Sequence, residues 1–130
     1  MSSVIVPSLR YENARKAIEF LKEGFGFEEH LVVPGEGDAI EHAQLTFGNA
    51  MIMLGSDRDN EYSDLVDSGG SQSIGLYVIV DDVDAHAKRA STAGAVIEME
   101  PEDQEYGGRL YTCRDPEGVV WSFGSYNPWA

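Results

Sequence analysis

Apolar residues in the first 55 positions occur in short runs and in one stripe with helical spacing. The run at residues 4–9 predicts a first strand, and Asn13 is suited to cap the helix that follows. One face of that helix is apolar: Ala14, Ala17, Ile18, Leu21 and Phe25. Gly24 and Gly26 end the predicted helix.

Three further apolar runs predict three strands. They cover residues 27–33, 40–47 and 50–54. Only Gly48-Asn49 separates the last two runs, which is typical of a two-residue hairpin turn. The first half of the chain is therefore predicted to form a strand, a helix and three more strands.

The second half repeats this order. Residues 74–80 predict a strand, and Asp81 is suited to cap a helix that ends at Gly94. Three strands follow it: residues 95–99, 109–114 and 119–123. The chain is therefore predicted to be an α+β protein built of two equivalent βαβββ modules.

The same pattern divides the chain into segments. Module one covers about residues 1–55 and module two about residues 73–124, both within one globular domain. Residues 56–72 are polar and acidic and predict a linker or loop, and residues 125–130 form an aromatic tail.

Charge and composition narrow the classes of partner. The chain has 9 basic and 23 acidic residues, so its formal net charge is -14. Nucleic acids and anionic membranes are recognised by clustered Lys and Arg, so neither is an expected partner. No apolar run reaches the ~18 residues of a membrane span. No leader opens the chain and Cys113 is the one cysteine, so we expect a cytoplasmic protein without disulfides.

Several short motifs identify a family resemblance. They are Phe25-Gly26-Phe27, the run at residues 80–85, Asp115-Pro116-Glu117-Gly118, and Trp121-Ser122-Phe123. In this order they resemble the glyoxalase/bleomycin-resistance/extradiol-dioxygenase superfamily, also called vicinal oxygen chelate. Residues 106–109 and 123–126 are similar to its PhnB-like branch. The resemblance implies a cupped, mostly antiparallel eight-stranded sheet around a ligand cavity, with helices on the outer face, in a homodimer.

Metal-dependent members of that superfamily hold a divalent ion with His and Glu side chains in the cup. The resemblance places the corresponding positions at Val6, Met53, Gly75 and Ser122. None of these residues offers an imidazole, a carboxylate or a thiolate. We therefore expect neither a metal nor another cofactor, and the metal-dependent activity of the family does not carry over.

Alternation along the strands predicts which residues face the cup. The Gly48-Asn49 turn pairs Gln44 with Met53, so that His42 shares their face. The same parity places Tyr77 and Ser122 in the cup of module two. Extended through the turn at residues 115–118, it also places Arg109, Tyr111 and Cys113 there. The predicted ligand-binding residues are therefore His42, Gln44, Met53, Tyr77, Arg109, Tyr111 and Ser122.

The roles of individual residues leave alternatives open. His42 is the candidate general base, or else a pocket residue that hydrogen-bonds a ligand or Gln44. His30 and His86 are predicted to lie on the surface, and Cys113 to be buried. Arg109 could bind an anionic group of the ligand or pair with a carboxylate of the protein.

The leading function from sequence is metal-free capture of a small, partly apolar molecule. The acid excess favours a cationic one. A metal-independent isomerase or lyase with His42 as base is the first alternative. The second is a metal lyase with relocated ligands, built from His42 with Glu41 or Cys113.

Overall fold

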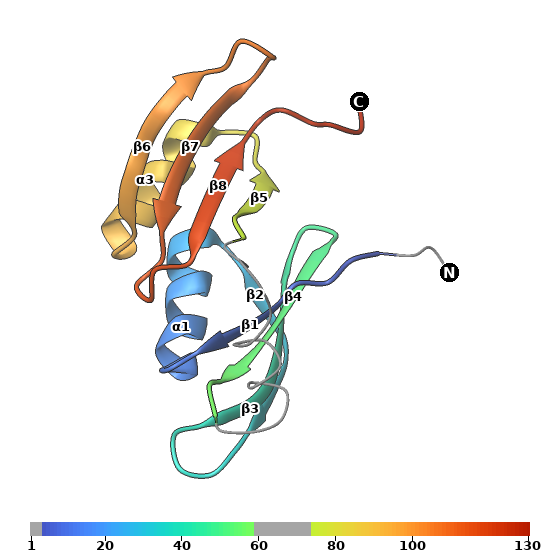
Figure 1. Cartoon of the computed structure of the whole chain (residues 1–130), viewed down its shortest axis with the longest axis vertical. Coiled ribbons are helices and arrows are strands. Elements are labelled where there is room, and N and C mark those ends of the chain that lie inside the picture. The colour runs from blue at the N-terminus through green and yellow to red at the C-terminus, as the bar shows by residue number, and fades with distance from the viewer. Residues whose placement is uncertain (1–3, 59–73) are drawn as a thin grey trace. The chain divides into compact units, whose positions relative to one another are not determined.

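The computed structural model describes residues 4–58 and 74–130, and the chain divides into two compact units (Figure 1). Unit 1 comprises Met1–Lys22 and Gly26–Gln72, and unit 2 comprises Glu23–Phe25 and Ser73–Ala130. The predicted linker at 56–72 lies outside the described residues, apart from its first three positions. Each unit is described by itself below.

Unit 1 forms a four-stranded sheet with one helix. Its elements are β1 (Ser8–Tyr11), α1 (Ala14–Phe20), β2 (Glu28–Pro34), β3 (Ile40–Phe47) and β4 (Ala50–Ser56). The strand order is β1-β4-β3-β2, with β1 parallel to β4 and the other pairs antiparallel. A short π-helix, η1 (Leu21–Phe25), continues α1 and ends at Gly26, whose φ of 90° is readily adopted by glycine.

Unit 2 repeats this arrangement. Its elements are β5 (Leu76–Ile79), α3 (Val83–Ala93), β6 (Val96–Asp103), β7 (Arg109–Arg114) and β8 (Val120–Gly124). The strand order is β5-β8-β7-β6, and β5 is the strand parallel to its neighbour. The predicted α+β fold of two βαβββ modules is confirmed, with the eight strands arranged as two four-stranded sheets.

The register makes the equivalence of the modules explicit. Ser8 pairs with Met53 in unit 1, and Tyr77 pairs with Ser122 in unit 2. Both residues of the second pair lie 69 positions after their counterparts in the first. The two modules therefore align residue for residue along these strands, although few of the aligned residues are identical.

Local signals locate the helices well and the first strand less well. The Asn13 side chain accepts a hydrogen bond from the Lys16 amide, which confirms the predicted cap. The cap of α3 is Asp82, which accepts from the Ala85 amide, and not the predicted Asp81. The first strand begins at Ser8 and not at Val4, which is 77% exposed.

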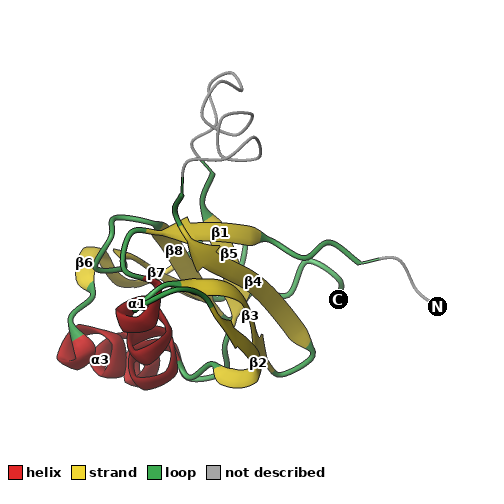
Figure 2. Ribbon diagram, turned by 90° about the horizontal axis from the view of Figure 1, so that it is seen from below, coloured by secondary structure: helices red, strands yellow, loops and turns green. Residues whose placement is uncertain are grey.

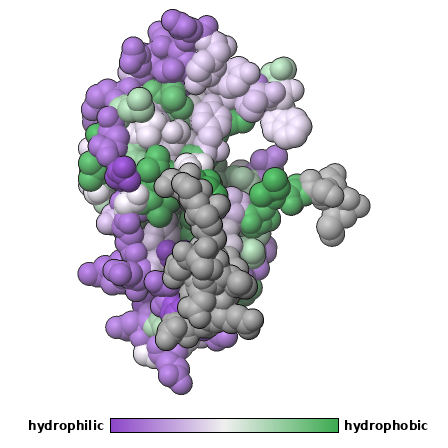
Figure 3. Space-filling view, in the orientation of Figure 1, coloured by the Kyte–Doolittle hydropathy of each residue, from purple (hydrophilic) through white to green (hydrophobic). Residues whose placement is uncertain are grey.

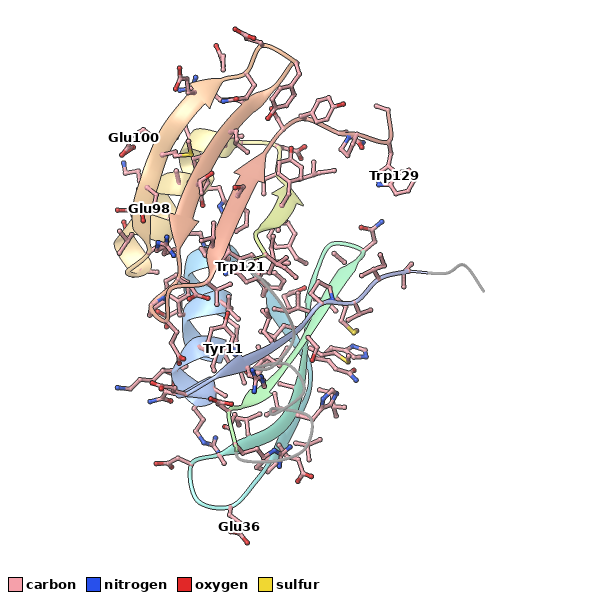
Figure 4. The ribbon with its side chains drawn as sticks, viewed as in Figure 1. Tyr11, Glu36, Glu98, Glu100, Trp121 and Trp129 are labelled. Atoms are coloured by element: carbon pink, nitrogen blue, oxygen red, sulfur yellow. The ribbon has the colours of Figure 1, made fainter. Side chains whose placement is uncertain are left out.

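In each unit a helix covers one face of the sheet (Figure 2). The first four residues of the predicted stripe are buried and belong to unit 1: Ala14, Ala17, Ile18 and Leu21. The fifth, Phe25, is buried in unit 2 against Trp121 and Phe123. In unit 2 the core includes Trp121 of β8, which Figure 4 labels together with Tyr11 of the unit 1 core. Within the described residues, no helix is long and apolar enough to cross a membrane.

Candidate functional site

The β3–β4 hairpin presents one apolar face to the core and one mixed face away from it. Gln44 pairs with Met53 across the hairpin, as the Gly48-Asn49 turn predicts. Ala43 and Leu45 point into the core and are fully buried, whereas Gln44 and Met53 are half-buried on the opposite face. The predicted orientation of His42, Gln44 and Met53 on one face is confirmed.

His42 and Gln44 are joined by a hydrogen bond on this open face. The Gln44 side-chain nitrogen lies 3.0 Å from His42 Nε2. An amide nitrogen can only donate, so His42 Nε2 accepts and the ring proton resides on Nδ1. The lone pair a general base would use is therefore engaged by Gln44. This geometry matches a pocket residue that orients a ligand better than it matches a base.

The rest of the open face of unit 1 is largely apolar. Leu31 and Val33 of β2 pair with Gln44 and His42, and their exposed fractions are 44% and 38%. Arg10 of β1 aligns with Gly55 on the same face, and its guanidinium pairs with Asp57 at 3.1 Å. A few polar groups thus interrupt an apolar surface, which is the composition typical of small-molecule sites.

The open face of unit 2 carries Tyr77 and Ser122, as predicted. These residues are partners in the β5–β8 ladder. Across the β7–β8 ladder Ser122 faces Thr112, and their hydroxyl oxygens lie 2.8 Å apart. Thr112 therefore takes the place that sequence reasoning gave to Tyr111.

The predicted orientation of Tyr111 and Cys113 is wrong. They pair with Phe123 and Trp121, and all four side chains are buried on the core side of the sheet. The loop before β8 contains five residues, because the Asp115 amide bonds to the Val119 carbonyl and Val120 is the partner of Arg114. A four-residue turn was assumed, and one additional residue reverses every side chain of β7 relative to β8.

Arg109 lies on β7 with the same alternation as Tyr111, so its predicted place in the cup is also wrong. Its guanidinium donates to Asp84 at 3.0 Å and to Asp103 at 3.1 Å. These hydrogen bonds raise the pKa of Arg109. The sequence left two roles for Arg109, binding an anionic group of a ligand or pairing with a carboxylate of the protein. The structure shows the second.

His86 is predicted to lie on the surface but is half-buried against the unit 2 core, where its ring packs on Phe25 and Phe123. Its Nε2 donates to the Phe25 carbonyl at 2.8 Å, which leaves Nδ1 to accept from the Tyr111 hydroxyl at 2.6 Å. Burial is the main cause that lowers its pKa. The signal was present in the helical spacing, because His86 stands three residues after Val83 and four before Ala90, both buried.

Cys113 is buried, as predicted. Burial, followed by the nearby charge of Asp115, raises the pKa of its thiol to about 12. A thiol with that pKa is protonated near neutral pH and is not a nucleophile there. His30, in contrast to His86, is exposed on β2 as predicted.

The residues at the four metal-ligand positions of the family do not fit a metal. In unit 1 they are Val6 and the thioether of Met53, and in unit 2 they are Gly75 and the hydroxyl of Ser122, which bonds to Thr112. Over residues 4–58 and 74–130, no three His, Cys, Asp or Glu side chains are grouped so as to hold an ion. The metal chemistry of the family therefore has no donor set at these positions.

Several known proteins are similar to this chain in sequence and in fold. The chain is 34% identical to an uncharacterized protein of Mycobacterium bovis over 121 residues, or 91% of this chain and 80% of that protein. It is 32% identical to TioX from Micromonospora sp. ML1, whose crystal structure superposes with a TM-score of 0.80 and covers 97% of this chain and 100% of TioX.

A glyoxalase/bleomycin resistance protein/dioxygenase family enzyme from Burkholderia phytofirmans PsJN has the same fold, with a TM-score of 0.73. It is 22% identical, and the match covers 90% of this chain and 93% of that enzyme. The family model for the Glyoxalase/Bleomycin resistance protein/Dioxygenase superfamily matches residues 4–123. The chain therefore belongs to this superfamily.

Proposed function

We propose that this protein is a metal-free small-molecule-binding protein of the PhnB-like branch, with a sequestration or resistance-type role. The observation that supports the proposal is the open face of the unit 1 sheet. It combines apolar side chains with the hydrogen-bonded pair of His42 and Gln44, and Met53, the cross-strand partner of Gln44, stands where metal-dependent members have a ligand. Such a face can bind and orient a ligand without supplying a reactive group.

The ligand class follows from composition and charge. Met51, Met53, Leu31 and Val33 offer adaptable apolar contacts on the open face. The net charge of -14 attracts cations and repels anions over the whole surface. The preferred ligand is therefore a small, partly apolar organic cation. The same charge disfavours nucleic acids and anionic membranes.

The protein is further proposed to act as a homodimer. Unit 2 exposes apolar side chains on its open face, among them Met99 at 62% and Val96 at 56%. The sheet of a second copy would remove this surface from water. Sedimentation equilibrium at micromolar concentration is expected to give twice the 14.3 kDa mass of one chain. A monomer at that concentration would contradict the homodimer.

Thermal melts with a panel of small amphiphiles test the binding function. Cationic members should raise the melting temperature in proportion to their affinity, and anionic members of matched size should not. Gln44→Ala should reduce this stabilisation, whereas Glu36→Gln, at the exposed turn between β2 and β3, should leave it unchanged (Figure 4). The proposal fails if no member of the panel stabilises the protein. Conversion of a bound member by the wild type, lost in His42→Ala, would instead support an isomerase or lyase.

A further inference from the structure

Three tyrosines from separate segments of unit 2 meet at one end of the unit. Tyr77 lies on β5, Tyr106 in the turn between β6 and β7, and Tyr126 in the tail after β8 (Figure 1). The rings of Tyr106 and Tyr126 meet edge to face, with centroids 5.1 Å apart and an interplanar angle of 83°. The Tyr77 hydroxyl donates to the Tyr126 carbonyl at 2.6 Å. One ring contact and one hydrogen bond thus tie the three segments together.

Two glycines make these crossings possible. A Cβ on Gly124 would lie 2.8 Å from the hydroxyl oxygen of Tyr77 and 3.0 Å from its ring. A Cβ on Gly108, whose φ is +73°, would lie 2.7 Å from the Tyr126 nitrogen. The backbone therefore carries no side chain at the two points where Tyr77 and Tyr126 approach it. The arrangement of the tyrosines is built into the unit.

The three side chains, joined by this ring contact and this hydrogen bond, remain accessible to solvent. Their exposed fractions are 42% for Tyr77, 58% for Tyr106 and 40% for Tyr126. The pKa of Tyr77 is raised, first by burial and then by the neighbouring phenols of Tyr106 and Tyr126. The hydroxyl of Tyr77 is therefore neutral at physiological pH. These tyrosines therefore attract a cation through their ring faces, which carry the negative part of the aromatic quadrupole.

Three carboxylates lie in or next to the β6–β7 turn that carries Tyr106. Hydrophilic residues gather at the β6–β7 end in Figure 3, and Glu102, Asp103 and Glu105 of this end are exposed. Arg109, the nearby cation, is held by Asp84 and Asp103. Glu102 and Glu105 form no ion pair with the described residues. Their charge is therefore available to an ion from solution.

We propose that Tyr77, Tyr106 and Tyr126, flanked by Glu102 and Glu105, form a binding site for the ammonium group of an organic cation. Aromatic faces attract quaternary and tertiary ammonium groups, and the two carboxylates add long-range attraction. The inference rests on the proposed function for the view that the protein binds small molecules. It adds a separate site for organic cations that lies wholly within unit 2, at the end of its sheet.

Choline and its uncharged carbon analogue, 3,3-dimethylbutan-1-ol, test the site directly. Titrations of the full chain are followed by NMR on labelled tyrosine rings. Choline should shift the resonances of Tyr77, Tyr106 and Tyr126 in a saturable way, and the neutral analogue should bind about two- to five-fold more weakly. Equal binding of the two compounds, or saturable shifts at other tyrosines alone, would overturn the site.

Matched variants separate the site from general electrostatics. Tyr106→Leu should weaken choline binding about two- to five-fold, and Tyr106→Phe, which keeps the ring, should not. Glu105→Gln should weaken it more than Glu117→Gln, which removes the same charge at the opposite end of β7. Tyr106 is exposed, so thermal melts should show that both variants at this position fold. Equal effects of the two glutamine variants, or no effect of Tyr106→Leu, would overturn the proposal.

The choline titration and the amphiphile panel fail independently. Tyrosine shifts with choline, but no stabilisation by any amphiphile, would leave the cation site standing and remove the proposed function. Stabilisation by amphiphiles that depends on Gln44, without tyrosine shifts, would do the reverse.

Discussion

The two sheets share strand order and register, but their last hairpins differ in length. In unit 1 two residues, Gly48-Asn49, join β3 to β4, so Gln44 faces Met53. In unit 2 the five residues from Asp115 to Val119 join β7 to β8, so Thr112 faces Ser122. The length of a loop thus decides which side chains of equivalent strands reach the open face. The open face of unit 1 carries Gln44 and His42. The equivalent positions of unit 2 carry Thr112 and Leu110.

The cores differ in the same way. The core side of the unit 1 hairpin is made of apolar residues, such as Ala43, Leu45 and Phe47. Beneath the corresponding hairpin of unit 2 lie polar groups that are hydrogen-bonded: His86 with Tyr111, and Asp115 with Trp121. A buried polar group costs free energy when it loses its partner. Unit 2 should therefore be sensitive to polar substitutions that have no counterpart in unit 1.

The largest effect is expected from a core aromatic residue of unit 2. Trp121→Ala removes a side chain that is 1% exposed and packs against Phe25, with ring centroids 5.1 Å apart. The free energy of unfolding should fall by about 3–5 kcal/mol. Leu45→Ala provides the unit 1 comparison, with an expected loss of about 2–5 kcal/mol. Denaturant unfolding measures both, and a loss below about 1 kcal/mol for Trp121→Ala would contradict its burial in the core.

The second prediction compares the two turns. The Asp115 carboxylate accepts from the amides of Glu117 and Val119, both at 3.0 Å, and from the Trp121 indole at 3.1 Å. Asp115→Ala should lower the free energy of unfolding by about 1.5–3 kcal/mol, because bonds to a buried charge are lost. Asn49→Ala, in the exposed turn of unit 1, should change it by less than about 0.5 kcal/mol. Similar losses in the two variants would show that the turns are not energetically different.

The short turn also explains what could be predicted from sequence. A two-residue hairpin has one register, so the orientations of Gln44, Met53 and Leu45 follow directly from Gly48-Asn49. The turn at Asp115 has strong turn residues but no unique length. Val119 is apolar and was assigned to the following strand, and its place in the loop depends on hydrogen bonds to Asp115 that the pattern does not reveal.

The wrong predictions for His86 and Arg109 have a different cause, which is that their hydrogen-bond partners cannot be identified from sequence. The prediction of His86 as a surface residue relied on polarity, although its helical position indicated burial. Its partners, the Phe25 carbonyl and the Tyr111 hydroxyl, come from residues 61 and 25 positions away in sequence. A polar residue is buried when distant groups satisfy it, and those groups become known only with the fold. The choice between the two roles of Arg109 could not be made from sequence for the same reason, because the fold brings Asp84 and Asp103 to its guanidinium.

The third prediction concerns the half-buried His86 and its hydrogen bonds. His86→Leu removes the hydrogen bonds to the Phe25 carbonyl and the Tyr111 hydroxyl, so the free energy of unfolding should fall by about 1–3 kcal/mol at neutral pH. The pKa of His86 is lowered in the folded protein. The unfolded chain therefore binds more protons as the pH falls through about 6.5.

The wild type should accordingly lose stability, relative to His86→Leu, as the pH falls from 8 through that value. Denaturant unfolding at several pH values gives the difference between the two proteins, in which the titration of the 23 acidic residues cancels. A difference that does not vary with pH would show that His86 is protonated equally in both states.

The smallest effect on stability is expected for residues on the open faces of the two sheets. His42 and Gln44 are half-buried on the open face of unit 1 and bond to each other, so His42→Ala and Gln44→Ala should each change the free energy of unfolding by less than about 1 kcal/mol. Thr112→Ala is the equivalent change in unit 2 and removes the hydroxyl that bonds to Ser122, with a similar expected loss. The three variants should therefore be alike in denaturant unfolding. His42→Ala and Gln44→Ala, on the proposed ligand face, should weaken amphiphile binding, whereas Thr112→Ala should not. A loss for His42→Ala as large as that for Leu45→Ala would place His42 in the core and remove this face as the ligand site.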